Sequence, residues 1–308
     1  MYKSNIDMKW GLWVCLLLFP LLPFAQQDAQ YSQYAFNSLL INPAYAGSRE
    51  ALSMVGLYRN QWLGYEGAPV TTTFSIHAPT ADLRHGFGLS LLNDRVGPSN
   101  MTAVAGSYAY RIPVSQKGWL AMGLQGELAN YRVGYQNLVL DQQGDATLGT
   151  ASYNRLLPNV GVGAWYNDQR LFAGVSMPRL IRSNLSPAGG DSRRATHAFA
   201  MAGYVLPLGK AVRLRPSVML KWASHAPVSM DFNLAALIQE RVWVGASYRT
   251  DKSLVLMTQL QITQMLRLGY SYDHGLEQIR RAGSSAHELM LGLDLRRTKN
   301  KMVSPRYF

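Results

Sequence analysis

Apolar and polar side chains alternate along most of this chain, in segments of about ten residues that are separated by turn residues. The segment around residue 122 is typical, because Leu120, Met122 and Leu124 alternate there with Ala121 and Gly123. Successive side chains of a β-strand point to opposite faces, so such a segment has one apolar face and one face of small or polar residues. The pattern predicts an all-β protein built from many short strands.

Counting these segments predicts about 14 strands, at 51–59, 70–78, 85–94, 101–112, 117–130, 157–167, 169–178, 195–207, 210–222, 229–239, 240–250, 253–263, 265–274 and 286–296. Their length and alternation are typical of a transmembrane antiparallel outer-membrane β-barrel, in which a closed ladder satisfies every backbone group in lipid. If the strands alternate in direction, the short connections fall at one end, at 79–84, 113–116, 168, 208–209, 239–240 and 264. The long connections all fall at the other end, at 60–69, 131–156, 179–194 and 275–285. Short periplasmic turns and long outer loops are the rule in such barrels.

A soluble, secreted all-β protein such as a jelly roll or a sandwich is the alternative, because its strands alternate in the same way. Two features favour the membrane barrel. The face opposite the apolar one mixes small residues with single charges, which suits the narrow interior of a barrel. Aromatic residues also lie near the ends of the predicted strands, as in the girdles at a membrane interface: Tyr108, Tyr110, Trp119, Tyr131, Trp165, Tyr166, Trp222, Tyr248, Tyr270 and Tyr272.

The N-terminus has the features of a secretory signal peptide. Lys3 and Lys9 precede an apolar run at 12–24, and Ala25 after this run is followed by polar residues. The run is too short for a helix that spans a membrane, and prolines interrupt it. We therefore predict three parts: a signal peptide at 1–25, an N-terminal plug or periplasmic segment at 26–50, and a barrel with a C-terminal tail at 51–308.

No catalytic centre or metal site is indicated by the residues. The six histidines are far apart in the sequence and have no carboxylate at ligand spacing. The single cysteine, Cys15, lies in the predicted signal peptide, so the exported chain has no thiol. No G-x-S-x-G nucleophile turn is present. We expect a protein that has no cofactor and is not an enzyme.

The chain is basic, with a formal net charge of +12 at pH 7. Such a balance suggests nucleic acid, anionic surfaces or acidic partners, and export argues against nucleic acid. Charges in the predicted strands fall on the polar face and are expected in the lumen: Arg213, Arg215, Lys221, Asp231, Arg241, Arg249, Arg267 and Asp294, with Glu127, Asp273, Glu288 and Arg296 beside them. Salt bridges among them close the lumen, or else the lumen is a pore or a partner-binding site. The predicted outer loops are also basic and suit lipopolysaccharide phosphates or an acidic partner, through Arg179, Arg182, Arg193, Arg194, Arg280 and Arg281.

The stretch "YSQYAFNSLLINPAYAG" at 31–47, which follows the predicted signal peptide, has neither a helical nor a strand pattern. Asn42 precedes a proline, which disfavours helix and favours a turn. The tyrosines offer rigid surface with a polar end, and the small residues let backbone pack closely. We expect this stretch at the periplasmic side or inside the lumen, as a plug or, less favoured, a partner-docking segment, with the candidate residues Tyr31, Tyr34, Asn42, Pro43, Tyr45 and Gly47.

Taken with "RNQWLGYEGAPVTTTFSIHAP" at 59–79, "GFGLSLLNDRVGP" at 86–98 and the terminal "SPRYF", this stretch resembles the PorP/SprF family of Bacteroidota type IX secretion membrane proteins. The resemblance spans the chain after the signal peptide. It implies an outer-membrane component of secretion or gliding machinery that helps to export or surface-anchor a secreted adhesin-like protein. It also implies two kinds of partner, the C-terminal domain of that secreted protein and periplasmic secretion-ring subunits. The family motif places an outer loop at Arg59, Gln61, Trp62, Gly64, Gly67 and Pro69.

A FadL-like outer-membrane channel for hydrophobic small molecules is the alternative function. Such channels are similar in predicted strand number and have an N-terminal plug, and the tripeptide at 42–44 resembles one found there. The charged character of the predicted lumen argues against this alternative.

Overall fold

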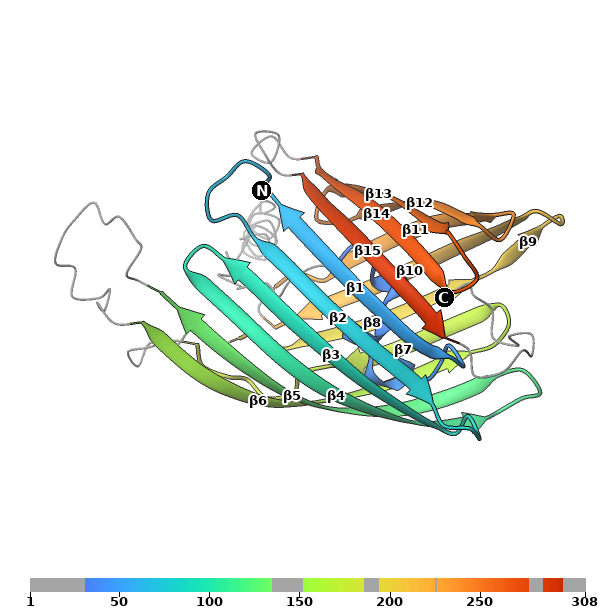
Figure 1. Cartoon of the computed structure of the whole chain (residues 1–308), viewed down its shortest axis with the longest axis horizontal. Helices are drawn as coiled ribbons and strands as arrows, with labels where there is room; N and C mark the ends of the chain where they lie inside the picture. Colours follow the sequence, from blue (N-terminus) through green and yellow to red (C-terminus); the bar gives the residue numbers. More distant parts are fainter. Residues whose placement is uncertain (1–30, 135–151, 186–193, 225, 277–284, 296–308) are drawn as a thin grey trace, which may run out of the picture.

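The structure is a computed structural model that describes residues 31–134, 152–185, 194–224, 226–276 and 285–295 (Figure 1). The predicted signal peptide and the C-terminal tail, with its "SPRYF" end, lie outside the described residues. Among the described residues, no helix is long and apolar enough to cross a membrane.

The strands follow one another along the chain as the alternation predicts. They are β1 (Leu52–Gln61), β2 (Val70–Pro79), β3 (His85–Val96), β4 (Ser99–Pro113), β5 (Trp119–Val133), β6 (Tyr153–Asn167), β7 (Leu171–Met177), β8 (His197–Tyr204), β9 (Leu206–Leu208), β10 (Val212–Ala223), β11 (Ser229–Ile238), β12 (Val242–Arg249), β13 (Ser253–Gln261), β14 (Leu266–Gly275) and β15 (Ala286–Leu295). Each pairs with its neighbour in antiparallel fashion, and β15 pairs with β1 to close the sheet. Because β8 and β9 both pair with β10 as two parts of one strand, this is a closed 14-stranded barrel, as predicted.

The interruption between β8 and β9 lies opposite a proline. Pro216 of β10 pairs with Leu234 of β11 on one side, but the ladder on its other side stops between Leu214 and Ser217. Proline has no N–H to donate, so a break in the neighbouring strand at this point costs little. Val205, the residue at the break, is buried, and its N–H donates to the Arg170 carbonyl oxygen at 2.8 Å.

The faces of the strands have the phase that a lipid-embedded barrel requires. On β5, Met122 and Leu124 point outward and are 59% and 61% exposed, whereas Ala121 and Gln125 point inward and are buried. A jelly roll or sandwich would bury its large apolar face against a second sheet. Here the small and polar face is the buried one, which excludes the soluble alternative.

The two ends of the barrel differ in their connections. Turns such as 168–170, 209–211 and 239–241 join the strands at one end, which we call the short-turn end. The loop at 62–69 and the described parts of the connection between β7 and β8, at 178–185 and 194–196, lie at the opposite, long-loop end. Strands β4, β5 and β6 are each 15 residues long and exceed their predicted bounds mainly at the long-loop end.

Residues 31–50, called the N-terminal segment below, lie inside the barrel (Figure 1). They form three 3₁₀ helices: η1 (Tyr34–Phe36), η2 (Ser38–Leu40) and η3 (Pro43–Tyr45). Nearly every residue of the segment is buried. Its Ser32 contacts strands near the long-loop end, and its Gly47 contacts Pro79 and Gly86 at the short-turn end. The segment therefore runs through the lumen from the long-loop half to the short-turn half.

Candidate functional site: the barrel interior

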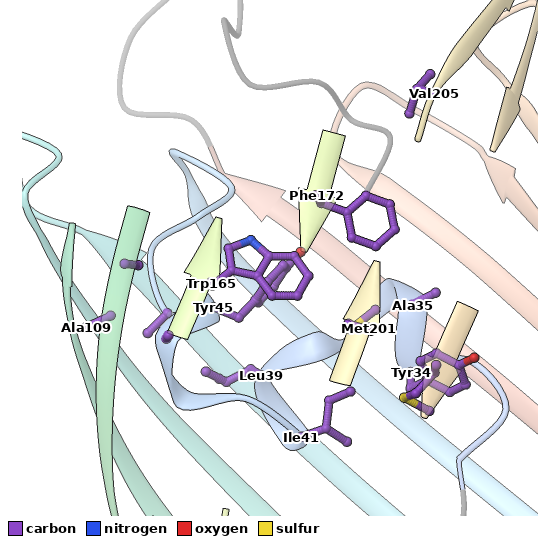
Figure 2. Packing of buried hydrophobic residues seen from close by; sticks show 14 residues of the cluster. Tyr34, Ala35, Leu39, Ile41, Tyr45, Ala109, Trp165, Phe172, Met201 and Val205 are labelled. Atoms are coloured by element: carbon purple, nitrogen blue, oxygen red, sulfur yellow. The ribbon is translucent and has the colours of Figure 1, made fainter. Parts of the chain in front are cut away.

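Aromatic and aliphatic side chains of the N-terminal segment form a core with the barrel wall (Figure 2). The Tyr45 ring meets the Trp165 ring edge-on at 5.2 Å and the His77 ring at 5.4 Å, measured between centroids. Trp165 in turn stacks on Phe172 at 5.8 Å. The prediction that Trp165 belongs to an outer aromatic girdle is wrong, because this side chain is 1% exposed and faces the lumen.

Glycines in the wall allow the segment's backbone to approach the strands closely. A Cβ at Gly123 would lie 2.2 Å from the Ala44 nitrogen, and a Cβ at Gly86 would lie 2.1 Å from the Ala46 carbonyl oxygen. Real Cβ atoms do not tolerate such distances, so only glycine fits at these positions. The wall is thus shaped to the backbone of the segment.

Asn42 joins the segment to two neighbouring strands. Its Oδ1 accepts a hydrogen bond from the Ala44 N–H at 3.0 Å, which caps η3. Its Nδ2 donates to the carbonyl oxygens of Ala164 and Val175, at 3.0 and 3.3 Å. Pro43 follows at the first helical position, where a missing N–H is harmless. The turn predicted at this position is present, as a capped 3₁₀ helix.

A buried set of charges holds the other end of the segment. We call it the Ser32 cluster, and it comprises Arg59, Lys221, Asp231, Arg249, Asp273 and Glu288. The Glu288 carboxylate accepts hydrogen bonds from the N–H groups of Ser32 and Gln33 at 2.9 and 2.8 Å. The Ser32 hydroxyl donates to Asp273 at 2.7 Å and accepts from Arg59 at 2.8 Å.

The members of the Ser32 cluster also pair with one another. Arg59 lies 2.7 Å from Asp273 and 3.2 Å from Glu288. Arg249 bridges Asp273 at 3.1 Å and Asp231 at 3.3 Å. Three cationic and three anionic side chains thus balance, which is the condition under which charges are tolerated away from water.

Further charges hold the segment at the short-turn end. Arg49 donates to Asp294 at 3.1 Å, and the same carboxylate pairs with Arg267. Arg111 donates to the Gly47 carbonyl oxygen at 3.1 Å, and His77 accepts from the Gly47 N–H at 3.1 Å. The segment is therefore bonded to the wall at both of its ends.

The guanidinium group of Arg215 packs against two aromatic rings, one from the N-terminal segment and one from the wall. Its guanidinium lies 4.9 Å from the centre of the Phe36 ring and 4.5 Å from that of Trp243. Such cation–π contacts stabilise a charge that is withdrawn from water.

Most of the predicted lumen charges lie inside the barrel, but not all of them. Arg215, Asp231, Arg249, Arg267 and Asp294 are buried there, and Lys221 is nearly so. The assignment of Arg241 is corrected, because it is exposed in the 239–241 turn before β12 begins. Arg213 is partly exposed and pairs with exposed Glu240 at the short-turn end. Arg296 lies outside the described residues.

The predicted outer-loop motif lies partly in strand β1 and partly in the loop that follows it. Arg59 is corrected, because it belongs to β1 and points into the lumen, and Gln61 ends the same strand. Trp62 is 47% exposed at the long-loop end with a φ of 54°, followed by Gly64 and Gly67 at φ values of 95° and 77°. Pro69, which ends the loop, is buried, and its carbonyl oxygen accepts from the Gln61 N–H at 3.0 Å.

Two of the basic loop residues are also corrected. Arg179 and Arg194 do not face outward but pair with buried Glu127, at 3.4 and 2.9 Å. Arg182 is exposed. Arg193, Arg280 and Arg281 lie outside the described residues.

The candidate tyrosines lie away from solvent. Tyr34 and Tyr45 are buried, and Tyr31 is half-buried beside a cavity. Burial raises the pKa of the Tyr34 hydroxyl, and the nearby Asp231 charge acts in the same direction. The protonated hydroxyl accepts a hydrogen bond from Asn233 at 2.8 Å. In this arrangement the tyrosines do not offer a surface to a periplasmic partner.

The long-loop half of the lumen contains a cavity of about 360 Å³. Tyr31, Tyr34, Leu40 and Ile41 of the N-terminal segment form part of its lining. In the part of the chain that the structure describes, no group of His, Cys, Asp and Glu side chains could hold a metal ion.

Comparison with known proteins identifies the family. The family model of the type IX secretion system membrane protein PorP/SprF matches residues 23–293. The chain belongs to the PorP/SprF family. This PorP/SprF protein is therefore a membrane component of a type IX secretion system, with the fold of an outer-membrane barrel. Neither the family nor the fold is that of an enzyme class. No curated protein matches the chain significantly.

Solved structures support the fold of this PorP/SprF chain. The toluene transporter TbuX of Ralstonia pickettii is 10% identical, with a TM-score of 0.52 over 84% of this chain and 93% of TbuX. The monoaromatic hydrocarbon channel CymD is also 10% identical, with a TM-score of 0.52 over 84% of this chain and 91% of CymD. At this identity the likeness concerns the barrel architecture alone.

Proposed function

We propose that this barrel helps to export or surface-anchor a secreted adhesin-like protein, as part of secretion or gliding machinery, by binding protein partners at its ends. The partners are the C-terminal domain of the secreted protein at the long-loop end and periplasmic secretion-ring subunits at the short-turn end. Outer-membrane lipid and lipopolysaccharide surround it, and nucleic acid is not a partner. A predicted signal peptide delivers the chain to this location.

The observation that carries the proposal is a structured loop with exposed aromatic side chains at the long-loop end. Trp62, Leu63 and Tyr65 are 47%, 51% and 55% exposed. The loop is fixed by backbone hydrogen bonds, from Trp62 to Ser285 at 2.9 Å and from Tyr65 to Trp62 at 3.1 Å. A positive φ at a bulky residue costs energy and persists only where the surroundings impose it. Pre-organised Trp and Tyr side chains are the residues most often central to protein interfaces.

The interior supports a role that does not depend on diffusion through the lumen. The N-terminal segment is bonded to the wall at both ends and fits against wall glycines, so we propose that it plugs the barrel. Cargo or partners then act at the two ends of the barrel rather than through it.

The proposal is tested by recovering the tagged protein, with its partners, from its native host. We expect a secreted surface protein or periplasmic secretion subunits in the recovered material. The double variant Trp62→Ala, Tyr65→Ala should lose the surface protein and keep the periplasmic subunits. The control Val114→Ala changes an exposed residue of the short-turn end and should keep the surface protein. Recovery of neither kind of partner by the unaltered protein would contradict the proposal.

A FadL-like channel for hydrophobic small molecules is the second candidate, favoured by the barrel architecture that this chain shares with TbuX and CymD. A channel requires the N-terminal segment to move, and the close backbone contacts at Gly123 and Gly86 oppose this. Loss of fatty-acid uptake on deletion of the gene, with no protein partner recovered, would favour the channel.

A further inference from the structure

The cavity in the long-loop half of the lumen is a cup, with walls that include β3, β4, β5, β8 and β10 and a floor from the N-terminal segment. We propose that the cup binds a neutral, largely apolar small molecule that carries a hydrogen-bonding group, and that it holds this molecule without passing it through the barrel. The volume of about 360 Å³ lies in the range of small-molecule sites.

The apolar character of the ligand follows from the lining. Leu92, Met101, Phe199 and Met219 line the cup from four different strands. Methionine side chains adapt to ligands of different shape. The neutral polar side chains of Ser90, Ser99 and Gln125 line it as well. Ser99 pairs with the Tyr131 hydroxyl and the Gln125 Oε1 accepts from Ser107, so the remaining hydrogen-bonding capacity of these side chains, such as the Gln125 amide N–H groups, orients a hydroxyl or carbonyl group.

The neutrality of the ligand follows from the charged side chains around the cup, because each of them is already bonded to another side chain of the protein. Glu127 is bound by Arg194 at 2.9 Å, and Lys221 by Asp231 at 2.7 Å. Asp94 accepts from the Thr71 hydroxyl at 2.6 Å. A charged ligand must give up its own hydration and compete with these bonds, whereas a neutral one leaves them intact.

The N-terminal segment forms the floor of the cup and prevents the ligand from passing further into the barrel. Tyr31, Tyr34 and Ile41 line the cup, and below them the segment continues into contacts with the wall at Gly123 and Gly86. A molecule that reaches the cup from the long-loop end meets this floor. The cup is therefore a binding site with a closed end.

Calorimetric titration of the detergent-purified protein with 1-naphthol tests the proposal, because 1-naphthol is neutral at pH 7 and has an apolar body with one hydroxyl. We expect saturable binding. Ala105→Phe places a ring in the cup from a residue that lines it and should weaken binding at least tenfold. The matched control Val104→Phe adds a ring to the outward face of the same strand and should bind as the unaltered protein does.

A heat-modifiable gel shift verifies that each variant is folded, and Phe199→Ala, which removes a wall side chain, serves if Ala105→Phe does not fold. The charged analogue 1-naphthalenesulfonate should bind at least tenfold more weakly than 1-naphthol. Absence of saturable binding, equal binding by both β4 variants, or equal binding of the sulfonate would each overturn the proposal. A failure here leaves partner recovery through Trp62 and Tyr65 unaffected, so the two proposals are separable.

Discussion

The two ends of the N-terminal segment are held by different physical means. The end near Ser32 is held by charge, because carboxylates and guanidinium groups from the four strands β1, β12, β14 and β15 converge on one hydroxyl and two N–H groups through charge-assisted hydrogen bonds. The end from Asn42 to Gly47 also has hydrogen bonds, to Arg111 and His77 among others, but its distinguishing feature is shape, because wall glycines leave room for its backbone and for no side chain. Buried ion pairs stabilise the bound position of the segment but allow small shifts, whereas close backbone contact leaves no gap between the segment and the wall. The first end should therefore contribute more to the free energy of unfolding, and the second should contribute more to closing the lumen to ions.

The largest expected effect comes from removing a buried charge at the first end. Glu288→Ala leaves Arg59 with one carboxylate fewer and two segment N–H groups without an acceptor. Breaking a buried pair from one side costs about 3–5 kcal/mol. We expect a loss of this size in the free energy of unfolding, measured by urea titration of the protein in lipid vesicles. The lumen should stay closed to ions in planar bilayers, because the second end is intact.

The control for this prediction is an ion pair of the same type at the surface. Glu240 pairs with Arg213 at 2.7 Å, and its side chain is 59% exposed. Exposed pairs contribute about 0–1 kcal/mol, so Glu240→Ala should change stability little. Equal losses for the two variants would show that the Ser32 cluster does not hold the segment by buried charge.

A smaller loss of stability, with a larger effect on closure, is expected at the second end. Gly123→Ala adds one methyl group whose carbon would lie 2.2 Å from the Ala44 nitrogen, so the segment must shift. Overpacking of this kind costs about 1–3 kcal/mol. We expect ion conductance in planar bilayers to rise, in contrast to Glu288→Ala.

Gly126→Ala on the same strand is the matched control, because a Cβ there meets nothing within 4 Å. It should leave both stability and conductance unchanged. If Gly123→Ala conducts no more than this control, shape at the second end does not determine closure.

The strand order and the lumen charges were predictable because they depend on local alternation. Period-two phase placed Asp231 and Arg249 inward without knowledge of their partners. The same rule failed at Arg241. This residue continues the sequence alternation of β12, but it lies in the tight turn at 239–241, where its side chain is exposed to solvent and not directed into the lumen. At the end of β6, Trp165 and Tyr166 are adjacent and lie on opposite faces, so only one of the two can belong to an aromatic girdle.

The contacts of the N-terminal segment were not predictable, because they connect distant positions. Ser32 and Glu288 are separated by 256 residues, and nothing local marks either as the partner of the other. Arg59 was mispredicted for a similar reason. The sequence motif that contains it continues into a loop, and nothing local indicates that Arg59 itself lies in β1 and points into the lumen. The alternation around Gly123 did predict a small inward face, but not the backbone that fills the space beside it.

The smallest expected effect is a difference in the free energy of unfolding between two serine variants of the N-terminal segment, one at the charged end and one farther along. Ser32→Ala removes an acceptor from Arg59 and from Arg249 and a donor to Asp273, and we expect a loss of about 1–2 kcal/mol because these groups remain buried. The Ser38 hydroxyl donates only to the nearby Tyr34 carbonyl oxygen, at 3.2 Å, so Ser38→Ala should cost about 0.5 kcal/mol. Urea titration of both variants in vesicles measures the difference. Equal values would mean that the carboxylate of Glu288 acts through the backbone N–H groups alone, and that the hydroxyl of Ser32 adds nothing to the charged end.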